Sequence, residues 1–481
     1  MLFNSVGFLI FFPAIALLFY SLPHKFRWLM LLIASCLFYM SFIPIYIFVL
    51  FATITVDYIA GILIENSQNT RRKQIYLSLS IFFTVLILFI FKYFNFFNAN
   101  ISGIASFFHW NYPIGLLRLI LPIGLSFHTF QSLSYVIEVY RGNQKAEHNF
   151  GIYSLYVMFF PQLVAGPIER PQHLLHQFYE EHKVNSHNIK EGLRQMLGGY
   201  FKKVVIADRL AAVVNTVYGN PTSYTGLTLI LATVLFAFQI YCDFAGYSDI
   251  AIGCAKAMGF TLMRNFNRPY LSKSISEFWN RWHISLSSWL KDYIYIPLGG
   301  NRVAIPRWCA NVLITFLVSG LWHGANWTYI LWGALFGIYL VASRLTQGAR
   351  GNLANAVHLD RHPRVYDSLA MLATFTFVNI GWVLFRASSM TDAVYILTHM
   401  LKGISLDRTA LNIGSSLPEL IVSITLILVL IAYELMQDRV DIIARLKAKP
   451  KWLRWSVYYA LIVLILLLGQ FGTRQFIYFQ F

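Results

Sequence analysis

One histidine between two long apolar runs is the residue best placed to do chemistry. His323 lies in the stretch Val318–Trp327, which reads Val-Ser-Gly-Leu-Trp-His-Gly-Ala-Asn-Trp, and Gly320 and Gly324 beside it permit close approach by another helix or a ligand. Polar groups in apolar surroundings are costly, so each is a functional candidate. A neutral imidazole in a dry pocket can accept a proton from a hydroxyl near physiological pH. The alternative is a core histidine bonded to a backbone carbonyl, and position alone favours neither interpretation.

A second histidine lies in the stretch Ser274–Leu290, which contains three tryptophans. Ser274 and Glu277 fit a capping box, so we expect a helix to begin there. Apolar residues then recur at helical spacing and predict a single amphipathic helix with His283 on its apolar face. Taken alone, this stretch favours an interfacial helix with a structural histidine.

Two carboxylates, Asp243 and Asp249, follow closely on an apolar run. Paired carboxylates can bind a metal or orient a histidine, but nothing supplies a third ligand at metal spacing, so we predict no metal site. Capping of helix starts or pairing with arginine is the interpretation that this pattern favours. The sequence also lacks a phosphate-binding glycine loop, a nucleophile elbow and an HExxH motif. Nucleotide hydrolysis, serine-esterase chemistry and zinc-protease chemistry are therefore excluded.

The composition places these residues in a membrane protein. Of the 481 residues, 57% are hydrophobic and 12% are charged, and the mean hydropathy is +0.57. Soluble domains carry about 25% charged residues, because their surfaces must stay wetted. Cys36, Cys242, Cys254 and Cys309 lie in or beside apolar stretches, without metal or disulfide spacing, and are expected to be small buried side chains.

Membrane helices must therefore position the candidate residues. A span needs about 20 apolar residues, and runs of that order predict roughly ten to twelve spans, with re-entrant and amphipathic helices between them. One expected span is Ile114–Val139. The stretch Phe160–Pro171 contains three prolines and a glycine, which predicts a re-entrant turn or sharp loop.

The net charge of +17 is explained mostly by orientation. Basic residues gather in alternate loops, whereas the loop Asn95–Pro113 has no charged residue. The positive-inside rule therefore predicts an extracytoplasmic N-terminus and cytoplasmic basic loops, such as the one with Arg344 and Arg350. Nucleic acid is excluded as a partner.

Several stretches together resemble the membrane-bound O-acyltransferase family, and within it the members that acetylate bacterial cell-surface polysaccharides such as alginate. The resemblance runs nearly end to end. The stretches that carry it are Phe160–Pro171, Gln239–Gly253, Asn265–Tyr270, Ser274–Leu290, Tyr293–Arg302, Gly320–Trp327 and the tail Phe476–Phe481. It implies an all-α, polytopic fold with a ring of membrane helices around a central funnel. The whole chain, 1–481, is then one membrane domain: N-terminal helices over 1–148, a core with the catalytic motifs over 149–345, and C-terminal helices over 346–481.

The resemblance also implies site residues. His323 matches the family's catalytic histidine, which would act as general base, and His283 matches its second characteristic histidine, which would orient the donor or support the oxyanion. We expect substrate binding by neighbouring residues and by the two carboxylates: Trp322, Asn326, Trp282, Asp243 and Asp249.

The resemblance implies substrates and partners as well. Acetyl-CoA, or an acyl carrier protein, would supply the acyl group from the cytoplasm, with no permanently bound cofactor. The acceptor would be an extracytoplasmic polysaccharide, reached directly or through a periplasmic or extracellular acetyltransferase partner, and the chain would lie among the lipids of the bacterial plasma (inner) membrane. The basic residues Lys202, Lys203, Arg264 and Arg268 could attract the phosphates of coenzyme A or only maintain topology.

Three alternatives remain at the level of sequence. One is D-alanyl or other acyl transfer to teichoic acid or peptidoglycan; the tail and the motif Pro297–Arg302 count against teichoic acid. Another is a lipid-linked glycan transporter, which predicts function without His323. The third is a scaffold that only recruits soluble acetyltransferases.

Overall fold

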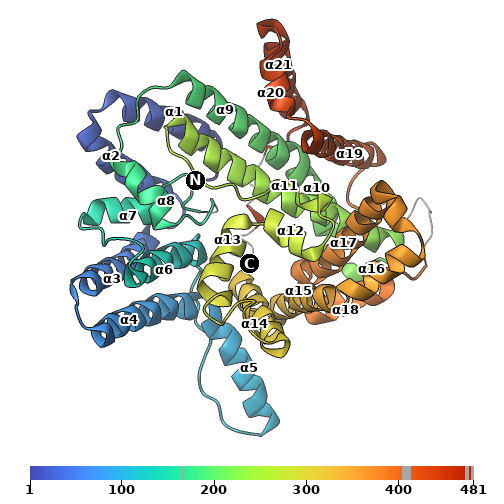
Figure 1. Ribbon diagram of the computed structural model, residues 1–481, viewed down its shortest axis with the longest axis horizontal. Coiled ribbons are helices and arrows are strands. Elements are labelled where there is room, and N and C mark those ends of the chain that lie inside the picture. Colours follow the sequence, from blue (N-terminus) through green and yellow to red (C-terminus); the bar gives the residue numbers. More distant parts are fainter. Residues whose placement is uncertain (165, 404–412, 472–475, 478–481) are drawn as a thin grey trace. The chain divides into compact units, whose positions relative to one another are not determined.

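The chain folds into helices throughout the part that the structure describes. The computed structural model describes residues 1–164, 166–403, 413–471 and 476–477, and every regular element in them is a helix (Figure 1). The predicted all-α class is therefore confirmed. The chain forms two compact units, unit 1 with Met1–Met196 and Ser248–Met263, and unit 2 with Leu197–Tyr247 and Arg264–Phe481. The division into three segments of one domain, and the funnel, stay predictions.

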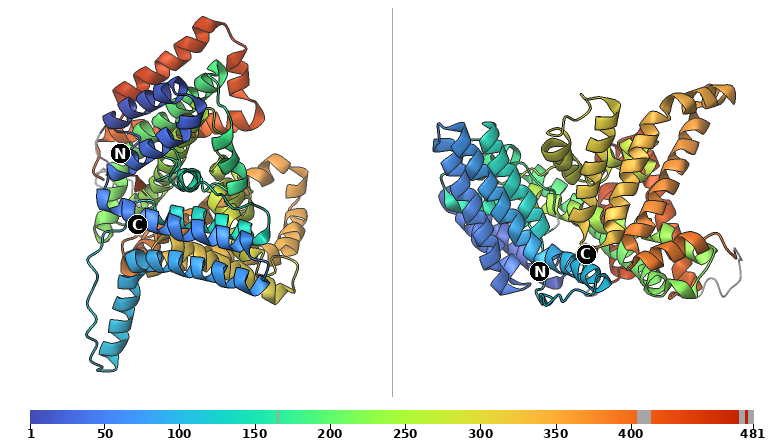
Figure 2. Two further views of the ribbon diagram at one scale, coloured as in Figure 1. Left: turned by 90° about the vertical axis from the view of Figure 1, so that its left-hand side faces the viewer. Right: turned by 90° about the horizontal axis from the view of Figure 1, so that it is seen from below.

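Unit 1 contains the N-terminal helices. They are α1 (Val6–Ser21), α2 (His24–Met40), α3 (Ile47–Asn66), α4 (Thr70–Leu88), α5 (Phe94–Phe107), α6 (Leu125–Arg141), α7 (Phe150–Met158), α8 (Pro171–Leu174), most of α9 (Ser186–Tyr200) and the end of α11 (Leu227–Ala257). Helices α3, α4 and α6 lie side by side in both Figure 1 and Figure 2. The buried Asp57 of α3 joins them, because it accepts hydrogen bonds from Ser80 and Thr84 of α4 and Ser132 of α6.

Unit 2 contains the remaining helices. They are the start of α11, α10 (Asp208–Gly219), α12 (Ile275–Arg281), α13 (Ile284–Leu290), α14 (Ile305–His323), α15 (Trp327–Leu345), α16 (Gln347–Ala356), α17 (Pro363–Arg386), α18 (Met390–His399), α19 (Leu417–Arg439), α20 (Ile442–Lys447) and α21 (Lys451–Leu468). Two short π-helical segments, η4 (Phe201–Ala207) and η7 (Lys291–Tyr295), precede α10 and follow α13.

The chain is a multi-pass membrane protein. Eight helices of the described residues are long and apolar enough to cross a membrane. The span predicted over Ile114–Val139 is wrong, because α6 begins only at Leu125. Pro122 and Gly124, which has a φ of 77°, interrupt the apolar run before it. The loop predicted over Phe160–Pro171 is confirmed for its described residues, which contain no helix before Pro171.

Helices α14 and α15 pack with their backbones in direct contact. A Cβ atom at Gly320 would overlap the carbonyl oxygen of Tyr329, and one at Gly333 would overlap that of Phe316. A Cβ atom at Gly324 would overlap the ring of Tyr329. The close approach predicted for Gly320 and Gly324 is therefore confirmed, and it fixes the end of α14 against the start of α15.

The close crossing predicts that a glycine-to-alanine substitution changes stability differently at Gly333 and at Gly348. Gly333→Ala inserts a methyl group against backbone that cannot move aside, so we expect a loss of about 1–3 kcal/mol in unfolding free energy. Gly348→Ala, in α16, places the same methyl group where no atom lies within 4 Å, and should be neutral or stabilising by about 0.4–1 kcal/mol. Thermal unfolding of the two detergent-purified variants makes the comparison. Equal melting temperatures would contradict the close crossing.

Candidate functional site: two histidines beside a basic pocket

The helix that was predicted to run through Ser274–Leu290 is broken at His283. Helix α12 begins after Ser274, whose Oγ accepts the N–H of Glu277 at 3.1 Å, so the predicted helix start is confirmed. It ends at Arg281, and α13 begins at Ile284. Between them His283 adopts a left-handed backbone with a φ of 43° and a ψ of 53°. Such a conformation costs a non-glycine residue about 1–3 kcal/mol and persists only where neighbouring contacts impose it.

The buried Asn265 supplies those contacts. Its carbonyl oxygen accepts the N–H of Ile284 at 2.9 Å. Its Oδ1 accepts the N–H of Ser285 at 3.2 Å and the Ser285 hydroxyl at 3.0 Å, and it lies 3.1 Å from His283 Nδ1. These bonds replace helical ones at the break, which is the physical reason that the single helix does not form. Asn265 was given no role from the sequence, although it begins the stretch Asn265–Tyr270 that carries part of the family resemblance.

His323 is the last residue of α14 and lies among aromatic rings. It is 5% exposed, and its ring centroid lies 4.9 Å from Trp322, 4.9 Å from Trp332 and 5.2 Å from Phe385. A helix C-terminus carries the negative end of the helix dipole, which stabilises a positive charge on a nearby side chain. The position is therefore a dry one at the negative end of a helix.

Trp322 connects the two histidines. Its ring centroid lies 6.1 Å from that of His283 and 4.9 Å from that of His323. Trp282 directly precedes His283 at the end of α12, and its ring centroid lies 4.9 Å from that of Trp382. The structure thus brings together both predicted histidines and both predicted tryptophans within unit 2.

The other three predicted binding residues are engaged elsewhere. Asn326 caps α15, because its Oδ1 accepts the N–H of Thr328 at 3.1 Å. Asp243 and Asp249 lie within α11, so the interpretation that they cap helix starts is wrong. Asp249 belongs to unit 1, where it accepts a hydrogen bond from Gln195 at 3.1 Å.

Asp243 takes part in a buried ion network with Lys203. The Nζ of Lys203 lies 2.6 Å from Asp243 and 2.9 Å from Asp208, and all three side chains are nearly inaccessible. Burial lowers the pKa of Lys203, but the two carboxylates outweigh burial and hold the pKa above its ordinary value. The prediction that Lys203 could attract coenzyme A is therefore wrong. Another residue of that basic group, Arg268, pairs with Asp438 at 3.1 Å.

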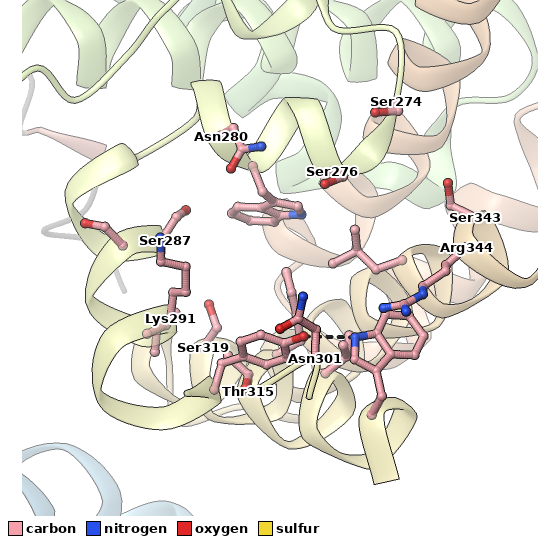
Figure 3. A pocket seen from close by; sticks show the side chains of 18 of the residues that line it. Ser274, Ser276, Asn280, Ser287, Lys291, Asn301, Thr315, Ser319, Ser343 and Arg344 are labelled. Carbon is pink, nitrogen blue, oxygen red and sulfur yellow. Dashed lines mark hydrogen bonds between the residues drawn. The ribbon is translucent and has the colours of Figure 1, made fainter. Parts of the chain in front are cut away.

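A basic pocket lies beside the histidines in unit 2. It has a volume of about 970 Å³ and is lined by residues of α12 to α17. Four cations contribute to the wall, namely Lys273, Lys291, Arg344 and Arg350, and none of the described lining residues is acidic. Lys273 pairs with Asp367 at 2.7 Å, whereas no carboxylate of the described chain pairs with the other three. Figure 3 shows Lys291 and Arg344 reaching the pocket from opposite sides.

An aromatic platform holds Arg344 in this pocket. Its guanidinium lies 4.3 Å from the ring centroid of Trp308, and the indole N–H of Trp308 donates to the Tyr295 hydroxyl at 2.9 Å, the dashed line in Figure 3. A guanidinium stacked in this way keeps its outward N–H groups available for an anion. Fixed aromatic and cationic groups side by side suit a ligand with a flat ring and phosphates.

The pocket reaches the histidines through three of its lining residues. Ser319 lies one turn before His323 on α14, a rise of about 6 Å. Trp279 packs against Trp332 at 5.7 Å, and Trp332 is a direct neighbour of His323. Ile284 adjoins His283 in the chain. The lining of the pocket therefore includes close neighbours of both histidines.

Comparison with known proteins shows what these motifs belong to. Residues 147–363 match the model of the membrane-bound O-acyltransferase family, and this range includes both histidines and nearly all of the pocket lining. The chain is 42% identical to the probable alginate O-acetylase AlgI of Pseudomonas aeruginosa, over 82% of this chain and 73% of that protein.

Two further relatives are named for other activities. The peptidoglycan O-acetyltransferase of Helicobacter pylori is 37% identical over 84% of this chain and 79% of its own length. The teichoic acid D-alanyltransferase of Bacillus subtilis is 26% identical over 56% of this chain and 69% of its own length. With its helical membrane fold and these relatives, the chain belongs to the membrane-bound O-acyltransferase family and is an O-acyltransferase.

Proposed function

We propose that this protein transfers acetyl groups from acetyl-CoA to hydroxyl groups of an alginate-like extracytoplasmic polysaccharide, directly or through a partner protein. The observation that carries the proposal is the pair of buried histidines, joined by Trp322, beside a pocket with cations and no acidic lining residue. The similarity to O-acetylating relatives supports acetyl as the transferred group. The alternative acceptors are peptidoglycan and teichoic acid, because two relatives are named for acting on them.

In the proposed reaction, His323 acts as the general base. A hydroxyl of the acceptor, or of a partner that carries the acetyl group onward, attacks the thioester carbonyl and gives its proton to the imidazole. The C–O ester bond forms, the C–S bond breaks, and the proton passes to the departing thiolate. The dipole of α14 stabilises the transient imidazolium. General-base assistance of this kind contributes about 10²–10⁴-fold.

The basic pocket is the proposed donor site. Coenzyme A carries phosphates and an adenine ring, which match the cations and the Trp308–Arg344 platform. The positive-inside rule predicts that the loop with Arg344 and Arg350 faces the cytoplasm, where acetyl-CoA is available. The acetyl group would then lie at the inner end of the pocket, near Ser319 and the histidines.

The acceptor is proposed to approach from the opposite, extracytoplasmic side of a bacterial plasma membrane. Two substrates that reach His323 from opposite sides can be bound there at the same time. Holding them in the reactive geometry lowers the activation barrier. Under the same orientation the N-terminus is extracytoplasmic. A periplasmic or extracellular acetyltransferase would complete the transfer where the polysaccharide is not the direct acceptor.

The role of His323 predicts a large loss of activity without a loss of fold. His323→Gln removes the base but keeps a polar side chain of similar length, and acetyl transfer should fall by about 10²–10⁴-fold. The measurement is the transfer of labelled acetyl from acetyl-CoA by protein in lipid vesicles. His187→Gln, at an exposed position of α9, is the matched control and should keep wild-type activity. Full acetyl transfer by folded His323→Gln protein would contradict the role of His323 as the base.

The donor pocket predicts a change in KM. Arg344→Gln should raise the KM for acetyl-CoA by about 10–100-fold, which corresponds to one lost bond to a charged group of about 1.5–3 kcal/mol. Acetyl-pantetheine, which lacks the nucleotide, should have the same KM in the wild type and in the variant. Arg71→Gln, at an exposed position of α4, controls for the loss of one positive charge. An unchanged KM for acetyl-CoA would place the donor elsewhere.

A further inference from the structure

We propose that Asn265 is a positioning residue that holds His283 as the Nδ1–H tautomer, so that Nε2 presents its lone pair to the reaction. The inference rests on the proposed function for the role of that lone pair, whereas the proton on Nδ1 follows from hydrogen bonding and the neutral ring from burial. It assigns His283 the role of a hydrogen-bond acceptor.

The identity of the Asn265 oxygen follows from its backbone partner. The N–H of Ser285 can only donate, and it points at Oδ1 over 3.2 Å. If the amide nitrogen of Asn265 lay at that place, two N–H donors would face each other. The atom there must therefore be the oxygen. The Ser285 hydroxyl, 3.0 Å away, completes the same arrangement.

The tautomer of His283 then has one solution. An amide oxygen only accepts, so the imidazole nitrogen 3.1 Å from it must carry a proton. Burial lowers the pKa of His283 to about 3, which keeps the ring neutral at physiological pH. A neutral ring with its proton on Nδ1 has its lone pair on Nε2. A neutral His283 therefore cannot donate from Nε2 to an oxyanion, and accepting a proton or a hydrogen bond is the role that remains.

The surroundings of His283 preserve this state. Phe244 of α11 packs on its ring at 4.6 Å, and Trp322 of α14 lies 6.1 Å away, so the faces nearest to it are aromatic. The titratable chain neighbours of these two rings are Asp243, which is paired with Lys203, and His323. The same residue that imposes the left-handed backbone at His283 thus also sets its protonation, through one side chain and one carbonyl.

The test is Asn265→Asp, which keeps an acceptor in place but adds a negative charge. A carboxylate next to an imidazole favours the imidazolium and raises its pKa by about 1–3 units. The neutral form of His283, which the wild type keeps down to about pH 3, is then lost as the pH falls through about 4–6. We expect kcat at pH 4, relative to pH 8, to fall about 2–100-fold further in the variant than in the wild type, with the KM for acetyl-CoA unchanged. Asn188→Asp, on α9 of unit 1, should keep the wild-type profile.

A second variant and a spectroscopic measurement separate this role from folding and from the proposed function. Asn265→Ala should lose kcat at every pH, and a wild-type kcat in that variant would overturn the proposal. Nitrogen-15 NMR of histidine-labelled protein, with the His283 signal identified by its absence in His283→Gln, reports the tautomer directly.

The outcomes of these measurements are distinct. A protonated Nδ1 in the wild type supports the proposal even if no acetyl transfer is found, which would defeat only the proposed function. A protonated Nε2, or overlapping pH profiles for Asn265→Asp and the wild type, would overturn it.

Discussion

The direct backbone contact between α14 and α15 determines where the candidate chemistry can occur. Because no side chain fits between Gly320 and Tyr329 or between Gly333 and Phe316, the two helices can cross at one separation only. His323 ends α14 three residues beyond Gly320, so the crossing sets its height relative to α15. Trp332 of α15 then lies directly against its ring. A catalytic base must be held to within about 0.5 Å, and a contact between backbones is stiffer than one between side chains.

Unit 2 contains two kinds of positively charged side chain. One kind is buried and paired with carboxylates and has a structural role, and the other lies at the pocket and is proposed to bind the ligand. Lys203 is buried, and an unpaired buried cation would cost several kcal/mol, so Asp243 and Asp208 compensate for it. Arg344 instead lies at a pocket with no acidic lining residue among those described, and stacks on Trp308. A cation held in place without a carboxylate partner costs less when an anionic ligand can reach it. The fixed geometry of Arg344 is therefore more informative about function than the number of basic residues in the chain.

The sequence predicted the features that depend on neighbours along the chain. The all-α membrane fold, the interrupted stretch after Phe160 and the close approach at Gly320 follow from local composition, and the structure confirms them. The break at His283 was missed because its cause is Asn265, eighteen residues away, and helical periodicity carries no record of that bond.

The pairing of charges was missed for the same reason. Lys203 was grouped with basic residues that could attract phosphates or maintain topology, since nothing local to it shows that Asp243 of α11 lies within 2.6 Å. The predicted tail Phe476–Phe481 is described only at Phe476 and Ile477, where Asp243 accepts the N–H of Ile477 at 2.8 Å. One carboxylate therefore joins three distant segments, which spacing along the chain could not reveal.

The two histidines lie in different environments, and this difference suits them to different roles in the proposed reaction. His323 stands at a helix C-terminus, where the dipole stabilises a positive charge, so it suits a group that gains a proton during the reaction. His283 stands between aromatic rings with a neutral amide on Nδ1, and burial holds its pKa near 3, so it stays neutral throughout. Groups of one type whose environments push them toward different protonation states are the usual basis for assigning acid–base roles. In the proposed mechanism His323 therefore exchanges the proton, while His283 is the hydrogen-bond acceptor.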